Sequence, residues 1–553
     1  MLGLFSRTFL DSAGHLSLEQ FHHLINHPVY HRVLRTSLEI AAWTTLICVF
    51  LGYPVAYYLA MAGESLRNRL LLIVLMPFWT GLLVRALAWV ILLADNGPLV
   101  NMAKTFGIAD AKLSYNLTGV LISLAHAYLP LAILCMLPVM QRIDSNVMNA
   151  AATLGAPRSQ VFWRIYLPLS LPGVTAGALV VFITALGNFI SPSVLGSPRE
   201  TMIAQVIITQ IQEVLNWGFA GVLSLVLLIA TLAVYYAYER TVGVAQFVGG
   251  VSPSLTSRSS DNFGSLRSKA GRLIFGTVGN VITAASNVTG LGRLSTKTSR
   301  QGLAAVAGLL LAFMSLPSLF VIPVSFNRST FLGFPLEGVS WRWYEELLTS
   351  PIWLSAAARS FIVAILTAGL ALALGIFASF VLTRREFPGR KVVVALVLAP
   401  MILPRIAIGA AMFYLFAHLD LVGTTLGLVI GHTVLALPYV VIALTANLSV
   451  YDRRFDEAAW VLGANKWRTL LHVTLPIIRG GVLAAAIFAF MTSLDDLSVA
   501  LFITGGEQAT LPKQMWNSMT LQATPILAAV STVILIVMTG CALGAEAVSH
   551  RKR

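Results

Sequence analysis

The chain has 553 residues, of which 57% are hydrophobic and only 11% are charged. Soluble domains usually carry about 25% charged residues, so this composition excludes an ordinary soluble protein. A net charge of +14 is compatible with binding to nucleic acid. Basic residues also gather in the cytoplasmic loops of membrane proteins, however, so we expect no nucleic-acid partner.

Eleven apolar runs follow one another along the chain, and each is near the roughly 20 residues that a helix needs to cross a bilayer. Backbone groups in lipid must be hydrogen-bonded within the chain, which favours helices, and barrel strands of about 10 residues do not fit such runs. We therefore predict an all-α polytopic membrane protein with about 11 transmembrane helices. The runs are 36–60, 70–94, 117–140, 170–190, 219–239, 303–324, 359–383, 392–416, 426–448, 477–502 and 523–546.

The distribution of basic residues predicts how the chain crosses the membrane. If the run at 36–60 passes from outside to inside and the later runs alternate, the inner segments hold 24 lysine and arginine residues and the outer segments hold 9. Because cytoplasmic loops are enriched in these residues, we expect the amino terminus outside and the carboxyl terminus inside.

The chain divides into two similar halves. The stretch TSLEIAAWTTLICVFLGYPVAYYLA at 36–60 resembles RSFIVAILTAGLALALGIFASFVLT at 359–383, and such internal duplication is common in transporters. The run at 303–324 has no counterpart in the first half. Either the true start lies upstream, or this half works with five spans.

Four regions are expected. The segment between the halves is basic and rich in Ser, Thr, Gly and Asn, which is typical of a flexible cytoplasmic tether. Its mildly apolar stretch at 273–292 is a poor span, and a position on the membrane surface beside anionic lipid is the alternative. The regions are an external segment at 1–35, a first domain with about five spans at 36–240, a basic cytoplasmic linker at 241–302 and a second domain with six spans at 303–553.

A polar motif occurs twice between the apolar runs. MNAAATLGAPRSQVFWRIYLP at 148–168 is followed, 308 positions later, by DEAAWVLGANKWRTLLHVTLP at 456–476. In each copy a short helix-forming stretch closes at a glycine, Gly155 or Gly463, and glycine is the usual residue just past a helix end. A second short stretch then ends at Leu-Pro. We predict two short helices with a sharp bend on the cytoplasmic side, because an ordinary loop would not be repeated at a fixed spacing.

The repeated motif resembles the signature of ABC importer permeases of the type I fold, which is Glu-Ala-Ala, three residues, Gly, nine residues, an aliphatic residue, one residue and Leu-Pro. In that family this loop is the coupling helix, which sits in a groove of the ATP-hydrolysing subunit. The second copy matches at Glu457, Ala458, Ala459, Gly463, Leu475 and Pro476. The first copy matches at Ala150, Ala151, Gly155, Leu167 and Pro168, with Asn149 in place of the glutamate. The basic residues Arg158 and Lys466 complete the expected ATPase-docking set.

The resemblance implies partners and a location. Two coupling loops imply two fused permease domains that dock two ABC ATPase subunits, with a periplasmic or extracellular solute-binding protein that delivers a small solute. The implied site is a bacterial inner membrane, in contact with lipid. The sequence contains no Gly-x-x-x-x-Gly-Lys-Ser/Thr phosphate-binding loop. We therefore expect the partner subunits to use ATP and Mg, and expect no enzyme activity, bound cofactor or metal in this chain.

The likeness extends over nearly all of both halves. The stretch at 77–101 resembles the first permease of the spermidine/putrescine uptake group, and the stretch at 491–516 resembles the second. A polyamine is therefore the first solute expected. Arg405 stands where polyamine permeases often have an acidic residue, so an anionic or zwitterionic solute or a metal complex is the alternative.

Charged residues inside spans are costly and are candidates for contact with the solute. Two neighbouring carboxylates fall in the run at 477–502; on a helix they would point about 100° apart, so one is expected to face the pathway. A packing pair, or a partner for Arg405, is the alternative. The pathway candidates are Arg85, Asn188, Arg405, Asp495 and Asp496.

Two alternatives concern proton transfer by histidine and the energy source of transport. His126 and His432 lie in matching spans, where hydrogen-bonded packing is expected ahead of a proton relay. A secondary transporter driven by an ion gradient would also show repeats and membrane carboxylates. The doubled loops favour the ATP-driven importer over this transporter and over a membrane scaffold.

Overall fold

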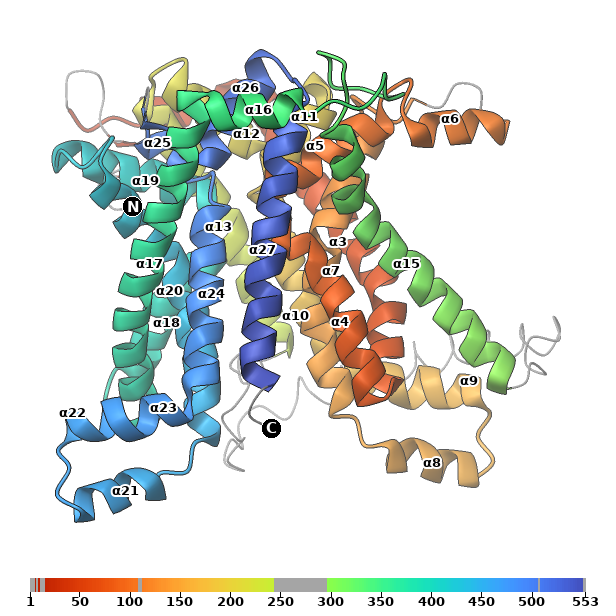
Figure 1. The fold of residues 1–553 in the computed structure, drawn as a ribbon, viewed down its shortest axis with the longest axis vertical. Helices are drawn as coiled ribbons and strands as arrows, with labels where there is room; N and C mark the ends of the chain where they lie inside the picture. The colour runs from red at the N-terminus through yellow and green to blue at the C-terminus, as the bar shows by residue number, and fades with distance from the viewer. Residues whose placement is uncertain are drawn as a thin grey trace.

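The computed structural model describes residues 15–107, 112–242, 296–505 and 508–550, together with Phe5, Thr8 and Phe9. Within these ranges the chain forms helices and no strand (Figure 1). The expected tether, including its apolar stretch at 273–292, lies almost wholly outside the described residues.

The first half forms a series of helices that ends before the tether. They are α2 (Glu19–Asn26), α3 (Pro28–Met61), α4 (Glu64–Trp79), α5 (Leu82–Leu93), α6 (Pro98–Thr105), α7 (Leu117–Gln141), α8 (Ser145–Thr153), α9 (Arg158–Val161), the π turn η1 (Phe162–Tyr166), α10 (Leu167–Leu186), α11 (Ile190–Leu195), the 3-10 turn η2 (Pro198–Glu200), α12 (Ile203–Gln212) and α13 (Trp217–Val242).

The second half repeats this order after one additional long helix at its start. Its elements are α15 (Thr296–Val324), α16 (Arg342–Thr349), α17 (Pro351–Arg384), α18 (Arg390–Ile402), α19 (Arg405–His418), α20 (Thr425–Val450), α21 (Arg454–Val461), α22 (Lys466–Thr469), the π turn η5 (Leu470–Thr474), α23 (Leu475–Ile477), α24 (Arg479–Leu494), α25 (Ala500–Ile503), α26 (Leu511–Leu521) and α27 (Ile526–His550).

Eight helices among the described residues are long and apolar enough to cross a membrane, or ten if each of two bent pairs counts as one span. The bends are 106° between α18 and α19, and 82° between Lys466–Ile477 and α24. The eleventh expected span coincides with α27, whose apolar part, Ile526–Cys541, is shorter. The all-α polytopic class is confirmed, although the run expected at 70–94 is divided between α4 and α5.

Each half is built on three long helices that pack against one another: α3, α7 and α10 in the first half, and α17, α20 and α24 in the second. Buried residues such as Cys48 and Leu129 fill the first bundle, and Val440 and Ala485 fill the second. A Cβ on Gly375 would lie 2.4 Å from Cγ1 of Val440. The absence of a side chain there therefore lets α17 and α20 approach closely, as small residues commonly do between membrane helices.

Equivalent hydrogen bonds confirm that the halves are structural repeats. The buried Ser37 hydroxyl on α3 accepts a hydrogen bond from the backbone N–H of Ile203 at 2.8 Å. In the second half, Ser360 on α17 accepts from Leu511 N–H at 2.7 Å. Each serine thus satisfies a free N–H in the first turn of α12 or α26. The duplication seen in the sequence is therefore a duplication of contacts.

Helix α15 connects the two halves through its packing. It belongs to the second half by sequence but packs against α3, α4 and α5 of the first half, and also against α27. Figure 1 shows it as the long diagonal helix beside α3 and α4. In the described part of the first half no corresponding helix covers α17 and α18.

The orientation of the chain is testable with reporters. A fusion at residue 553 is expected to be active with a cytoplasm-dependent reporter and inactive with a periplasm-dependent one, because the basic loops hold that end inside. A fusion after Thr105, in a segment with few basic residues, provides the control and is expected to behave in the opposite way. Periplasmic activity at residue 553 would contradict the predicted orientation.

Candidate functional site

The two copies of the repeated motif fold into matching helical hairpins. In the second copy, α21 ends next to Gly463, whose φ of +85° favours glycine. The N–H of Gly463 donates to the carbonyl of Trp460 at 3.0 Å, and Ala464 N–H donates to Ala459 O at 2.9 Å. These two bonds form a Schellman turn, which closes a helix and reverses the chain. The sharp bend predicted from the glycine is present.

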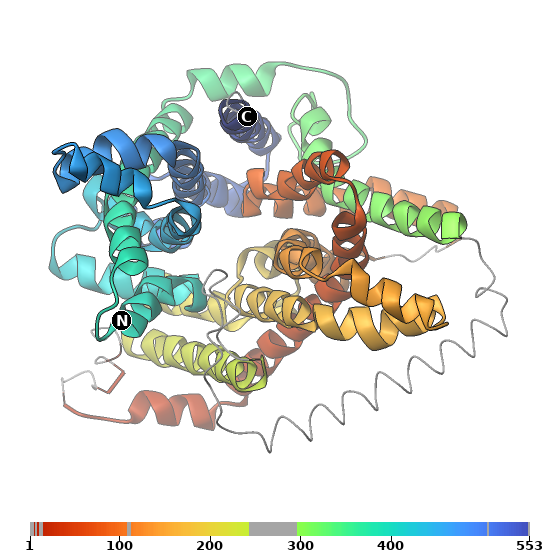
Figure 2. The same ribbon diagram turned by 90° about the horizontal axis from the view of Figure 1, so that it is seen from below.

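The first hairpin uses the same turn. Gly155 has a φ of +83°, its N–H donates to Ala152 O at 3.0 Å, and Ala156 N–H donates to Ala151 O at 3.1 Å. Both hairpins lie at one edge of the molecule, at opposite corners, with α8 and α9 on one side and α21 and α22 on the other (Figure 1). The view from below shows the same separation (Figure 2).

The tips of both hairpins present apolar side chains to solvent. Leu154 and Leu462, which are equivalent in the two copies, are 88% and 87% exposed. Trp467 on the second hairpin is also exposed. Exposed apolar groups rimmed by polar residues are typical of protein–protein contact sites. The two hairpins therefore match each other in exposing an apolar side chain at the tip.

A buried carboxylate that we did not single out from the sequence fixes the second hairpin to its own half. Asp456, 1% exposed, accepts hydrogen bonds at 2.8 Å from the hydroxyls of Tyr451 and Thr474, and it forms an ion pair with Arg384 at the end of α17. Burial, together with the hydrogen bond to Asp456, raises the pKa of Tyr451. The one sequence signal was an acidic residue directly before Glu457.

The first hairpin is fixed by apolar contacts instead. Met148 and Tyr166 stand where the second copy has Asp456 and Thr474. The Tyr166 ring packs edge-on against Tyr57 at a centroid distance of 4.7 Å, and Met148 packs against the same cluster. The two hairpins therefore share a backbone shape while different forces hold them in place.

The pathway candidates lie near the junction of the two halves, but the carboxylates are not on a helix as expected. Helix α24 ends at Leu494, and Asp495 is its C-terminal cap. The half-buried Asp495 accepts a hydrogen bond at 3.1 Å from the N–H of Leu82, the first residue of α5 in the other half. The expectation of two carboxylates 100° apart on one helix is wrong, because the helix stops before them.

Asn188 and Asp496 occupy equivalent positions and make the same local bond. Asn188 Oδ1 accepts from Ser191 N–H at 3.1 Å, and Asp496 Oδ2 accepts from Val499 N–H at 2.8 Å. Each side chain thereby satisfies a backbone donor near the start of a short helix. The Asp496 carboxylate also lies 3.6 Å from Nε2 of the buried His432.

The two arginines of the candidate pathway differ in exposure. Arg85 is buried and donates to the carbonyl of Ala127 at 3.2 Å. Arg405 is exposed and donates to the Tyr439 hydroxyl at 3.3 Å. No ion pair joins Arg405 to Asp495 or Asp496, all of which the structure describes. The alternative in which a carboxylate pairs directly with Arg405 is therefore not realised.

The histidines of the two matching spans are buried and hydrogen-bonded. His126 is buried and bonds the carbonyl of Met314 through Nε2 at 2.9 Å, while His432 bonds the Ser493 hydroxyl through Nδ1 at 2.8 Å. Near the amino terminus, the ring of His23 packs against Phe219 at 4.8 Å.

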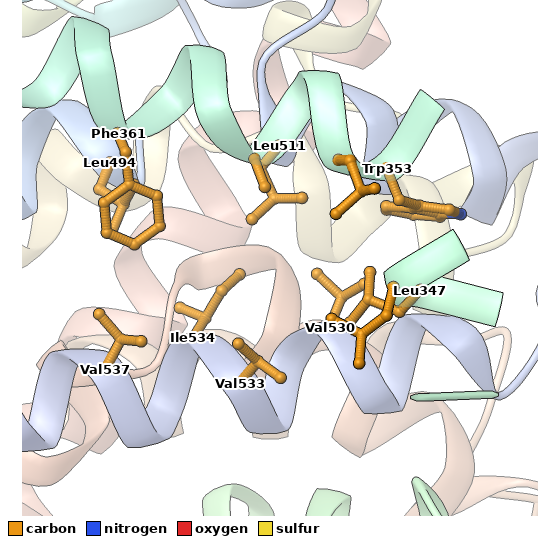
Figure 3. Close-up of a pocket in the computed structure, with 12 residues that line it drawn as sticks. Leu347, Trp353, Phe361, Leu494, Leu511, Val530, Val533, Ile534 and Val537 are labelled. Carbon is orange, nitrogen blue, oxygen red and sulfur yellow. The ribbon is translucent and has the colours of Figure 1, made fainter. Parts of the chain in front are cut away.

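A pocket of about 140 Å³ lies between α17 and α27 and is lined only by apolar side chains (Figure 3). A polar solute requires convergent polar groups in its site. The pocket therefore does not bind such a solute through its lining, which consists of Leu347, Leu348, Trp353, Leu354, Ala357, Phe361, Leu494, Leu511, Val530, Val533, Ile534 and Val537.

A duplicated bundle of apolar helices, with matching hairpins on one edge, defines a polytopic membrane permease built from two fused domains. Comparison with known proteins identifies its family. The chain matches the model of the binding-protein-dependent transport system inner membrane component over residues 51–241 and 371–550. It belongs to this family of ABC importer permeases, whose members work with an ATPase and a solute-binding protein.

Relatives of both permease types of one transport system match the chain. It is 32% identical over 229 residues to the spermidine/putrescine transport system permease protein PotB of Escherichia coli K12, covering 40% of this chain and 83% of the relative. It is 29% identical over 244 residues to PotC of the same strain, covering 44% and 91%. PotC of Haemophilus influenzae is 30% identical over 228 residues, covering 41% and 87%.

Among solved structures, a bacterial ABC transporter involved in import of the acidic polysaccharide alginate matches with a TM-score of 0.38 and 15% identity. The match covers 47% of this chain and 99% of the other.

Proposed function

We propose that the chain supplies both permease domains of an ATP-driven importer for a small solute of the polyamine type. In this proposal one ABC ATPase subunit docks on each hairpin, at 149–168 and 457–476, and a periplasmic binding protein delivers the solute. Closure of the ATPases, which use ATP and Mg, draws the hairpins together and exposes the pathway alternately to each side. The observation that carries the proposal is the pair of matching hairpins with exposed leucine tips on one edge.

The proposal assigns roles to the regions of the chain. The two permease domains are 36–240 and 303–553, preceded by an external segment at 1–35 and joined by a cytoplasmic linker at 241–302 in a bacterial inner membrane. Among the docking residues, Asn149 and Glu457 are exposed near the start of each hairpin, and Arg158 and Lys466 begin α9 and α22. The basic side chains are suited to contact an acidic rim on the partner.

The decisive experiment separates ATP-driven import from import driven by an ion gradient. The full chain is reconstituted in liposomes with the ABC ATPase and binding protein encoded beside its gene, and uptake of labelled spermidine and putrescine is measured. Uptake that requires ATP and both partners supports the proposal. Uptake that proceeds without the ATPase and collapses with the proton or sodium gradient would overturn it in favour of a secondary transporter.

A second solute class is favoured by Arg405. Arg405 is an exposed residue whose guanidinium donates to the Tyr439 hydroxyl, whereas Asp495 and Asp496 already accept backbone hydrogen bonds. A guanidinium attracts carboxylate and phosphate groups. An anionic or zwitterionic solute is therefore the alternative to a polyamine.

We expect Arg405 to determine whether the permease prefers anionic or cationic solutes. If the solute is anionic or zwitterionic, Arg405→Gln should lower its uptake about tenfold, because a charge-assisted hydrogen bond of about 1.5 kcal/mol or more is lost. If the solute is a polyamine, the same change should leave uptake unchanged or raise it. Arg359→Gln, at a half-buried site near the outer end of α17, is the matched control. Uptake of one cationic and one anionic solute is measured for the parent protein and for both variants. The result decides between the two solute classes.

A further inference from the structure

A polar contact joins the two halves at the point where a span of the first half is broken. Helix α4 ends at Trp79, α5 begins at Leu82, and Gly81 is the N-terminal cap of α5. The Asp495 carboxylate, at the end of α24 in the other half, accepts the Leu82 N–H at 3.1 Å. A Cβ on Gly81 would lie 2.3 Å from Asp495 Oδ1. The carboxylate therefore occupies the space that the glycine leaves free.

The internal repeat contains an equivalent junction, between the end of α10 and the start of α19, where the contact is apolar. Gly187 caps α10 as Asp495 caps α24, and Pro404 caps α19 as Gly81 caps α5. A Cβ on Gly187 would meet Cβ of Pro404 at 3.5 Å and the backbone nitrogen of Arg405 at 3.9 Å. The second junction is therefore an ordinary van der Waals contact, built by the same elements with no carboxylate.

The contact at Asp495 has two favourable components. A hydrogen bond to an ionised carboxylate is stronger than one between neutral groups. The carboxylate also lies at the amino terminus of α5, where the helix dipole favours negative charge. Each component acts only while α24 and the break between α4 and α5 remain in contact.

We propose that Asp495 is a positioning residue that latches the first half to the second and holds the two hairpins apart. This inference rests on the proposed function, since alternating access is the motion that the latch opposes. In the structure the Asp495–Leu82 hydrogen bond is one of the contacts that join the halves, while the hairpins lie at opposite corners of the lower edge (Figure 1). Breaking the latch removes a contact specific to this arrangement and shifts the population towards hairpins that lie closer together.

The test measures the distance between the hairpins in the full chain in lipid nanodiscs, without any ATPase. Spin labels are placed at Leu154→Cys and Leu462→Cys, whose side chains are 88% and 87% exposed, after the three native cysteines are replaced by alanine. Pulsed electron paramagnetic resonance then gives the distribution of distances. Asp495→Ala removes the acceptor, whereas Gly81→Ala keeps the aspartate but places a Cβ where its Oδ1 now lies.

Both variants are expected to raise the ratio of short to long distances about tenfold, the effect of losing one charge-assisted hydrogen bond. Gly187→Ala, at the counterpart junction, is expected to match the parent, and Asp495→Asn, which keeps an oxygen acceptor, is expected to lie between. Unchanged distances in both Asp495→Ala and Gly81→Ala would overturn the inference, as would an equal shift in Gly187→Ala. Because no ATP is involved, a failure of ATP-driven uptake would leave this result standing.

Discussion

Gly463→Pro is expected to abolish transport while the partner ATPases continue to hydrolyse ATP. The glycine has a φ of +85°, which proline, fixed near −65°, cannot adopt. Proline also lacks the N–H that Gly463 donates to Trp460 O at 3.0 Å. The Schellman turn is therefore lost, and the helix that docks no longer leads rigidly into α24. The transmembrane helices do not depend on this turn and should insert normally.

The experiment compares ATP hydrolysis and solute uptake in proteoliposomes. We expect uptake to fall by at least about a hundredfold, because a local penalty of about 3 kcal/mol opposes the docked shape. Gly463→Asn is the matched control, since asparagine tolerates a positive φ better than most residues and keeps the N–H. Normal uptake and normal stimulation of the ATPase in Gly463→Pro would show that the hairpin does not transmit the motion.

Asp456→Ala is expected to loosen the second hairpin and leave the first unaffected. The change leaves Arg384 without its carboxylate and removes the acceptor for Tyr451 and Thr474. Breaking a buried ion pair from one side typically costs about 3 kcal/mol or more. Amide hydrogen exchange in residues 454–476 should therefore accelerate about a hundredfold.

The same sample contains its own reference, because the first hairpin is held by Met148 and Tyr166 and should exchange at its normal rate. Glu457→Ala, one residue away and exposed, is the control for side-chain removal without loss of the anchor. Unaltered exchange in Asp456→Ala, or equal acceleration in Glu457→Ala, would contradict the role given to Asp456.

The features that could be predicted from the sequence are the local ones and those that occur in both halves. The apolar runs indicated the helices, and the glycine and Leu-Pro positions indicated the bend of both hairpins. The π turns before each Leu-Pro were not predicted, although their cause is local. Pro168 and Pro476 crowd the carbonyls of Arg164 and His472, four positions earlier, which lie inside η1 and η5.

Contacts between distant segments could not be predicted in this way. Asp495 and Leu82 are 413 positions apart, and periodicity carries no information about such a pair. The apolar run at 477–502 also concealed the end of α24 at Leu494, because the residues beyond it remain hydrophobic in the short helix α25. Asp456 was missed for a related reason: its partner Arg384 lies on another helix.

The crossing of α15 has a consequence for biosynthesis. The face formed by α3, α4 and α5 is covered by α15, which ends at Val324. During synthesis this helix leaves the ribosome well after α13, the last helix of the first half. Domains made during synthesis generally fold in order from the amino terminus, but here the earlier domain is finished only when the later one has begun. A chain divided within the linker would leave α15 on the second fragment, so the fragments would have to reassemble by exchanging a helix.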